Sequence, residues 1–156
     1  MTWQPGRDKI TDLVSDGELE RVEPSEDTAG RLLQDATRHL DTAAVALSTG
    51  DLSGAYQLAY DSLRKSAAGL LAVQGLRATS RGGHIAVQDA VLAQFGASVR
   101  ALRSFARIRR ARNTFEYPST TTPGPSVDDV NDAITSATAV YDAAQKILQQ
   151  NILTQW

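Results

Sequence analysis

Residues 52–71 read LSGAYQLAYDSLRKSAAGLL. Apolar or small side chains return at every third or fourth position of this stretch, at Leu52, Ala55, Tyr56, Ala59, Leu63, Ala67, Leu70 and Leu71. Because an α-helix makes one turn in about 3.6 residues, this spacing puts all of them on one face. Asp51 is a suitable N-terminal cap, and Gly75 suits the C-terminal end. We therefore expect a long amphipathic helix here.

Two flanking segments have the same spacing. The first begins near Ser25 and ends at Thr49-Gly50, and its apolar positions are Ala29, Leu32, Leu33, Ala36, Leu40, Ala43, Ala44 and Leu47. The second follows Ser126, which forms a capping-box pattern with Asp129, and its apolar positions are Val130, Ala133, Ile134, Ala137, Tyr141, Ala144, Ile147 and Leu148. Both segments are expected to be amphipathic helices.

Between these long segments, a shorter helix is expected over residues 84–95 and an arginine-rich helix over residues 98–116, which Pro118 ends. No stretch alternates between polar and apolar residues as a half-buried strand does. The sequence therefore predicts an all-α fold, an antiparallel bundle of four main helices plus short helices.

The composition fits one globular domain, because the chain has 156 residues, of which 42% are hydrophobic and 22% charged. No apolar run is long enough to span a bilayer and the N-terminus has no secretion signal, so we expect a cytoplasmic protein without membrane association. The absence of cysteine excludes disulfides and thiolate metal sites. We expect no metal and no cofactor, because the two histidines, His39 and His84, are far apart in the sequence.

The first 27 residues carry eight acids and three basic residues. Ile10, Leu13 and Val14 suit one or two helical turns, but Gly17 and Pro24 interrupt any longer helix. We expect residues 1–27 to be an acidic N-terminal extension and residues 28–156 to be the helical domain.

Six arginines and no acid lie between Arg100 and Arg112, in a chain whose net charge is -2. A helical wheel divides them into two sets. The inner set, which continues the apolar stripe of Val99, Leu102, Phe105 and Ala106, is Arg109, Arg112, Asn113 and Glu116. The outer set, on a separate arc of roughly 80°, is Arg100, Arg103, Arg107 and Arg110.

Each set has two interpretations. The outer arginines either hold phosphates of RNA, DNA or a nucleotide, or form a solvated helix face, or a face that the acidic N-terminal extension folds across and neutralises. In the inner set Arg112 and Glu116 are four residues apart and can pair, as can Asn113 and Tyr117. That group is either a functional site or a polar latch that fixes the helix end against the following loop or against a second subunit.

The stretch from Arg109 to Pro118, RRARNTFEYP, resembles the late motif of HEPN (higher eukaryotes and prokaryotes nucleotide-binding) domains. The alanine-rich helix over residues 55–67 and the segment that ends in Gly83-His84 add to the resemblance, which covers about residues 29–150. It implies a bundle of four or five helices, commonly a homodimer. It also implies a bacterial toxin-antitoxin or phage-defence role, commonly beside a nucleotidyltransferase.

Catalytic HEPN members are metal-independent endoribonucleases with an arginine followed, four to six residues later, by histidine. Arg112 matches the motif arginine and Asn113 the polar residue after it, but Tyr117, Pro118 and Ser119 stand where histidine is expected. Tyrosine side chains titrate far above neutral pH and do not replace imidazole as acid and base. His84 could supply an imidazole only if the fold turned it toward Arg112.

We therefore expect a nucleotide- or RNA-binding HEPN-like component of a toxin-antitoxin or phage-defence system that lacks the family's usual ribonuclease activity. In this hypothesis Arg112 contacts phosphate or the sister motif, Asn113 orients it, Glu116 holds it and Tyr117 lines the cleft. One alternative is an endoribonuclease toxin with an altered motif, for which His84 is also a candidate. Another is an interaction module whose arginines bind an acidic partner.

Overall fold

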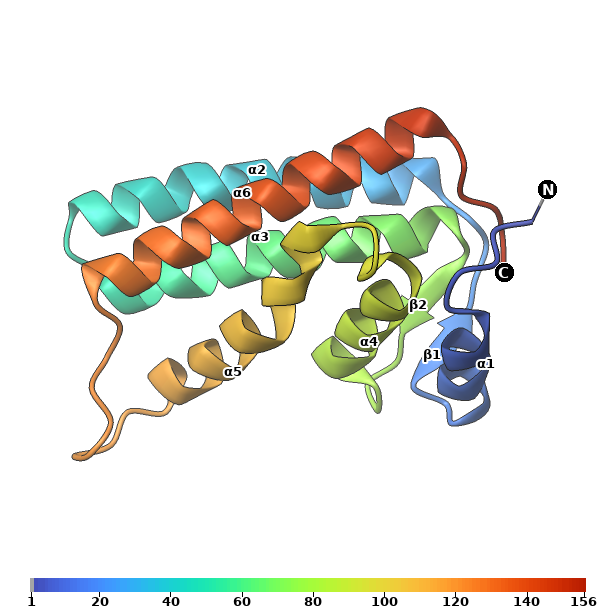
Figure 1. Ribbon diagram of the computed structural model, residues 1–156. Coiled ribbons are helices and arrows are strands. Elements are labelled where there is room, and N and C mark those ends of the chain that lie inside the picture. The colour runs from blue at the N-terminus through green and yellow to red at the C-terminus, as the bar shows by residue number, and fades with distance from the viewer. Residues whose placement is uncertain (1) are drawn as a thin grey trace.

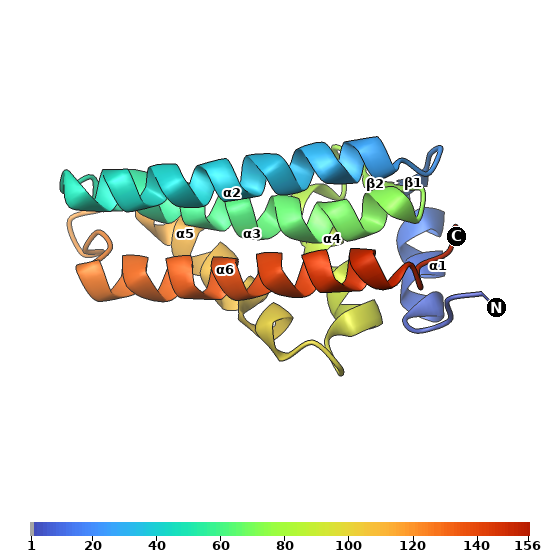
Figure 2. The ribbon, with the colours of Figure 1, turned by 90° about the horizontal axis from the view of Figure 1, so that it is seen from above.

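Three long helices form one layer of the protein: α2 (Glu26–Ser48), α3 (Leu52–Val73) and α6 (Val127–Gln150). The computed structural model, which describes residues 2–156, has them side by side (Figures 1 and 2). The chain direction of α2 is opposite to that of α3 and α6. All three helices were predicted from the sequence. The core between them contains many alanines, which allow helix axes to approach closely.

Capping residues fix where these helices begin. Ser25 Oγ accepts a hydrogen bond from Thr28 N at 3.0 Å, and Asp51 Oδ1 accepts one from Gly54 N at 2.9 Å. At the start of α6, Ser126 Oγ and the Asp129 carboxylate each accept a backbone N–H of the other residue, at 3.1 Å and 2.8 Å. The expected capping box is confirmed, and each cap satisfies backbone donors that the helix leaves free.

Two shorter helices, α4 (Gly83–Phe95) and α5 (Phe105–Glu116), lie on the opposite side of α3 from α2 and α6 (Figure 1). A 3₁₀-helix, η1 (Arg100–Ser104), precedes α5. The prediction of one continuous helix over residues 98–116 was wrong.

Val99 is extended, with φ −110° and ψ 92°, so the chain becomes helical only at Arg100. Short 3₁₀ turns are common at the N-terminus of an α-helix, and here η1 buries Leu102 before α5 buries Phe105 and Ile108. Over five residues, a 3₁₀-helix also rotates the side-chain direction about the helix axis by roughly 100° more than an α-helix does. Tyr117 leaves helical geometry, and Pro118 follows, as expected.

A small antiparallel sheet, β1 (Leu19–Arg21) with β2 (Leu76–Ala78), was not predicted. Its strands are three residues long, too short to show an alternating pattern. Glu20 lies opposite Arg77, and their side chains form an ion pair of 2.7 Å across the strands.

The expected acidic extension contributes helix α1 (Arg7–Ser15) and strand β1 to the structure. Ile10, Leu13 and Leu19 are buried in the same core as the long helices. The Trp3 ring also stacks on Phe95 of α4, with ring centroids 5.4 Å apart. Residues 2–27 therefore pack on the helical bundle, and residue 1 lies outside the described residues.

Within residues 2–156, the helices are too short or too polar to cross a lipid bilayer.

Candidate functional site

The arginines of the inner set face α3 from α5. Arg112 is partly buried, with 19% of its side chain exposed. Its Nε donates to Gln57 Oε1 of α3 at 2.6 Å, and its Nη1 donates to Asn113 Oδ1 at 3.1 Å. The same Nη1 lies 2.7 Å from Glu116 Oε2, which confirms that these two residues pair. Within the described chain, Nη2 has no hydrogen-bond partner, so the guanidinium is oriented but keeps a free donor.

Tyr60 connects Arg112 to His84. The Arg112 Cζ atom lies 5.6 Å from the centroid of the Tyr60 ring, a distance at which a cation is attracted to an aromatic face. The Tyr60 hydroxyl shares a hydrogen bond of 3.0 Å with His84 Nδ1. The fold therefore brings His84 of α4 into the neighbourhood of Arg112. Among residues 2–156 the two side chains form no direct hydrogen bond.

The surroundings of Tyr60 and His84 favour the neutral form of both side chains. Burial raises the pKa of Tyr60 to about 12, so its hydroxyl stays protonated. Burial also lowers the pKa of His84, and the positive charges of Arg64, Arg112 and Arg109 lower it further, against the opposing charge of Asp61. Near neutral pH His84 is therefore a neutral imidazole at the edge of a positive site.

Arg109 and Arg64 add two more guanidinium groups to this neighbourhood. Arg109 Nε donates to Gln88 Oε1 of α4 at 2.8 Å. Arg64 Nη2 lies 3.6 Å from Asp61 Oδ1. The Arg64 Nε is buried and has no hydrogen-bond partner within the described residues. Three guanidinium groups thus meet only two carboxylates, those of Asp61 and Glu116.

Sequence reasoning missed the residues that α3 and α4 contribute: Gln57, Tyr60, Asp61, Arg64 and Gln88. On α3 they follow each other at spacings of three, one and three, beside the apolar stripe. That polar patch on one helical face was a usable signal, but the sequence does not show which helix covers it.

Burial confirms the division of the six arginines, because Arg109 and Arg112 are partly buried and the outer four are exposed. The prediction that Asn113 and Glu116 continue the core-facing stripe was wrong, since both are exposed. Phe115 takes that position and packs edge-on against the Tyr56 ring, 4.9 Å between centroids. A helical wheel drawn over residues 98–116 assumes α-helical rotation throughout. The extra rotation in η1 moves the buried face of α5 away from Asn113, so that wheel assigned the core-facing positions wrongly.

Two of the four outer arginines have partners inside the protein. Arg103 donates to the backbone carbonyls of Gly96 and Ala97 at 3.0 Å and 3.3 Å. Arg107 forms an ion pair with Asp132 of α6. Arg107 is therefore neutralised by α6, and not by the acidic N-terminus. Only Arg100 and Arg110 of this set form no side-chain hydrogen bond or ion pair within residues 2–156.

Tyr117 stands at the exposed end of α5, with 76% of its surface accessible. A hollow of about 370 Å³ lies next to it between α3 and α5. Arg112, Glu116, Gln57 and Phe115 line this hollow, whereas Tyr117 is absent from its lining. Tyr117 therefore does not line this hollow, and its expected place in a cleft stays a prediction.

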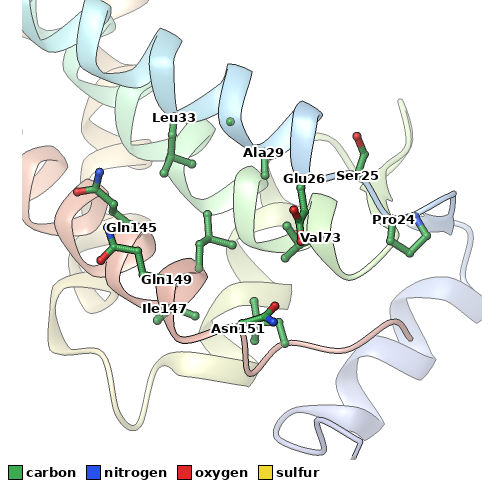
Figure 3. Close-up of a pocket in the computed structure, with 13 residues that line it drawn as sticks. Pro24, Ser25, Glu26, Ala29, Leu33, Val73, Gln145, Ile147, Gln149 and Asn151 are labelled. Carbon is green, nitrogen blue, oxygen red and sulfur yellow. The ribbon is translucent and has the colours of Figure 1, made fainter.

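A larger hollow of about 580 Å³ lies at the other end of the three-helix layer. Its walls come from the start of α2 and the end of α6, with Leu33, Val73, Gln145 and Asn151 around it (Figure 3). None of the described residues that line it is basic or a histidine. The smaller hollow beside Arg112 is therefore the better candidate for an anionic ligand.

Residues 2–156 contain no group of three or more histidine, aspartate or glutamate side chains that lie close enough together to bind a metal ion.

The protein-family model described as HEPN domain matches residues 29–148. This range is more than half of the chain and includes α3, α4, α5 and most of α6. Comparisons with curated proteins and with solved structures give no match.

Proposed function

Because the chain belongs to the HEPN family, we propose that it binds a phosphate group of RNA or of a nucleotide at Arg112. The observation that carries this proposal is the partly buried guanidinium of Arg112. It is oriented by Gln57 of α3 and still has a free Nη2 donor. Arginine binds phosphate through two parallel N–H donors, so a guanidinium fixed in this way is prepared for that contact.

Glu116 supports the same proposal, because its side chain is 43% exposed and pairs with Arg112 at the protein surface. Only the Glu116 end of this pair is exposed, since the Arg112 side chain is 19% exposed, and a carboxylate already in contact with water returns to solvent at little cost. A phosphate can therefore replace the carboxylate on Arg112 at low cost, while Glu116 turns into solvent. In the free protein Glu116 keeps the guanidinium in place, and the hollow beside it offers room for a ligand.

The motif argues for binding without the family's usual cleavage, because Tyr117 stands where the catalytic histidine is expected. The Tyr117 side chain is exposed, and its hydroxyl group forms no hydrogen bond within residues 2–156. In this proposal Asn113 positions Arg112, and Arg109 extends the positive surface toward α4.

A second function, metal-independent endoribonuclease, is favoured by one observation. The hydrogen bond from Tyr60 to His84 brings an imidazole to the Arg112 neighbourhood from another helix. In such a reaction the 2′-oxygen attacks the neighbouring phosphorus and the bond to the 5′-oxygen breaks. The imidazole removes the proton of the 2′-hydroxyl and returns it to the 5′-oxygen, so no water is consumed.

The biological setting is proposed from the family. We propose a homodimer that works in the cytoplasm, within a toxin-antitoxin or phage-defence system, with a nucleotidyltransferase-type protein as partner. A rival proposal is an interaction module, in which the unpaired outer residues Arg100 and Arg110 bind an acidic protein.

Binding of a fluorescent single-stranded RNA tests these proposals. Arg112→Ala is expected to weaken binding by about tenfold or more, since a hydrogen bond to a charged group contributes about 1.5–3 kcal/mol. The slope of affinity against salt concentration should also fall by about one. Arg110→Ala removes the same charge from an exposed position and is the matched control. Equal effects of the two substitutions, or salt-insensitive binding, would contradict the Arg112 site.

Cleavage is tested on total RNA in the presence of a metal chelator. We expect the RNA to stay intact. Cleavage by the wild-type protein that disappears in both Arg112→Ala and His84→Gln would establish the endoribonuclease instead.

A further inference from the structure

We propose that Arg64, His84 and Arg109 complete the Arg112 site, so that phosphate binding is coupled to the uptake of a proton by His84. This inference rests on the proposed function and extends it to three residues outside the Arg-Asn motif. The site would draw one side chain from α3, one from α4 and two from α5. Its ligand class is a phosphate group, which a phosphodiester of RNA or the phosphomonoester of a nucleotide can supply.

The contacts of His84 and Arg112 with one buried ring, that of Tyr60, carry the proposal. Tyr60 lies on α3 and is fully buried, and its side chain contacts both His84 and Arg112. Its hydroxyl holds His84 Nδ1 at 3.0 Å, and the Arg112 guanidinium lies 5.6 Å from the centre of its ring. Arg64 follows Tyr60 by one helical turn on α3. Arg109 binds Gln88, which follows His84 by one turn on α4. A ligand in reach of His84 is therefore in the field of all three arginines.

Arg64 provides an independent observation, because its Nε is buried and has no hydrogen-bond partner within the described residues. Its pairing with Asp61 is loose, with 3.6 Å between Nη2 and Oδ1. A buried donor without a partner is unfavourable, and such groups often point to an absent ligand or water. An arriving phosphate oxygen would give this guanidinium an acceptor.

His84 is oriented to donate to such a ligand. When the Tyr60 hydroxyl donates to Nδ1, the neutral imidazole carries its proton on Nε2. When the imidazole is protonated, Nδ1 donates to the Tyr60 oxygen and Nε2 still carries a proton. In both states Nε2–H is the donor that Tyr60 leaves free, on a residue that is partly exposed to solvent.

The charges that face His84 explain the coupling. Arg64, Arg109 and Arg112 oppose the protonation of His84, and Asp61 is the one acid that favours it. Phosphate bound among them adds negative charge beside the ring and favours imidazolium. The protonated protein must then bind phosphate more tightly, because linkage between the two sites is reciprocal.

The experiment follows His84 directly by NMR in protein labelled on its histidines. The chain has two histidines, and His39 on α2 is an internal reference in every sample. The probe is a hexauridylate with hydroxyl ends, whose phosphodiesters do not titrate between pH 5 and 8. At saturation we expect the pKa of His84 to rise by about one unit while that of His39 stays constant. Affinity should then be about tenfold higher below the pKa than above it.

Matched variants assign the effect to residues. Arg64→Gln and His84→Gln are expected to weaken binding at low pH and to reduce its pH dependence, whereas Arg110→Gln should leave the pH dependence unchanged. Uridine monophosphate forms a second arm: binding of this probe alone, with the His84 shift, would identify a nucleotide as the source of the phosphate.

The outcomes separate the two proposals. Arg112-dependent binding of either probe without a change in the His84 pKa overturns the coupling and leaves the proposed function standing. If neither probe binds, both proposals fail.

Discussion

The two sides of α3 make different kinds of contact. Toward α2, Gly69 allows an approach so close that an added Cβ would lie 2.6 Å from Leu33 Cδ1. Toward α4 and α5, Gln57 binds a partly buried Arg112 and Tyr60 binds His84. The hollow beside Leu33 and Val73, on the α2 side of the protein, has no basic side chain among the described residues that line it to bind an anion. The cationic binding chemistry therefore lies on the side of α3 that faces α5.

The largest effect on stability is expected from overfilling the packed side. Ala36 of α2 is fully buried, and Ala36→Leu should lower the free energy of unfolding by about 1–3 kcal/mol, because the core has no space for the larger side chain. Urea denaturation measures this. Arg38→Leu on the exposed face of α2 is the control and should change stability by about 0.5 kcal/mol or less. Equal stability of the two variants would mean that the α2 side is loosely packed.

Gln57→Leu tests the polar side. It removes the acceptor that orients Arg112 Nε, and we expect hexauridylate affinity to fall about fivefold, the equivalent of one ordinary hydrogen bond. Urea denaturation should show that the fold survives. Unchanged affinity would show that the orientation of Arg112 by α3 is irrelevant to binding.

A smaller effect is expected on the acid sensitivity of the fold. His84 has a lowered pKa in the folded protein, so the unfolded chain takes up its proton at a higher pH, near the ordinary value of 6.5. Stability is therefore full above that pH and falls as the pH drops from it through the folded pKa. His84→Gln should reduce this loss between pH 7 and 5, measured as the shift of the urea midpoint. A reduction as large in His39→Gln would show that the effect is not specific to His84.

The smallest effect is expected at Arg107, whose charge Asp132 already answers. Arg107→Gln should change the free energy of unfolding by about 0.5 kcal/mol, as exposed ion pairs do. It should also leave RNA affinity near that of the wild type. A loss of affinity as large as that of Arg112→Ala would restore the outer stripe as the phosphate surface.

The three-helix layer was predictable because its signals are local. Spacing of apolar residues and caps such as Asp51 and Ser126 act within one helix, and the structure confirms them. The division of the arginines into exposed and partly buried groups was predictable for the same reason. It survived although the helix breaks into a 3₁₀ segment before Phe105.

The rest of the site depends on contacts between distant segments. Gln57 and Arg112 are 55 positions apart, and Tyr60 and His84 are 24 apart. No spacing rule joins such pairs, because the packing angle of α4 and α5 on α3 decides which side chains meet. The three-residue strands and the burial of Ile10 likewise depend on partners that the sequence does not identify.

The central claim is that phosphate binds at Arg112, between α3 and α5. A crystal structure of the protein with bound hexauridylate tests it most directly. We expect a phosphate oxygen within hydrogen-bond distance of Arg112 Nη2, with the Glu116 carboxylate displaced and Gln57 still bound to Nε. Phosphates found on Arg100 and Arg110, or in the hollow beside Leu33 and Val73, with the pairing of Arg112 and Glu116 unchanged, would contradict the account.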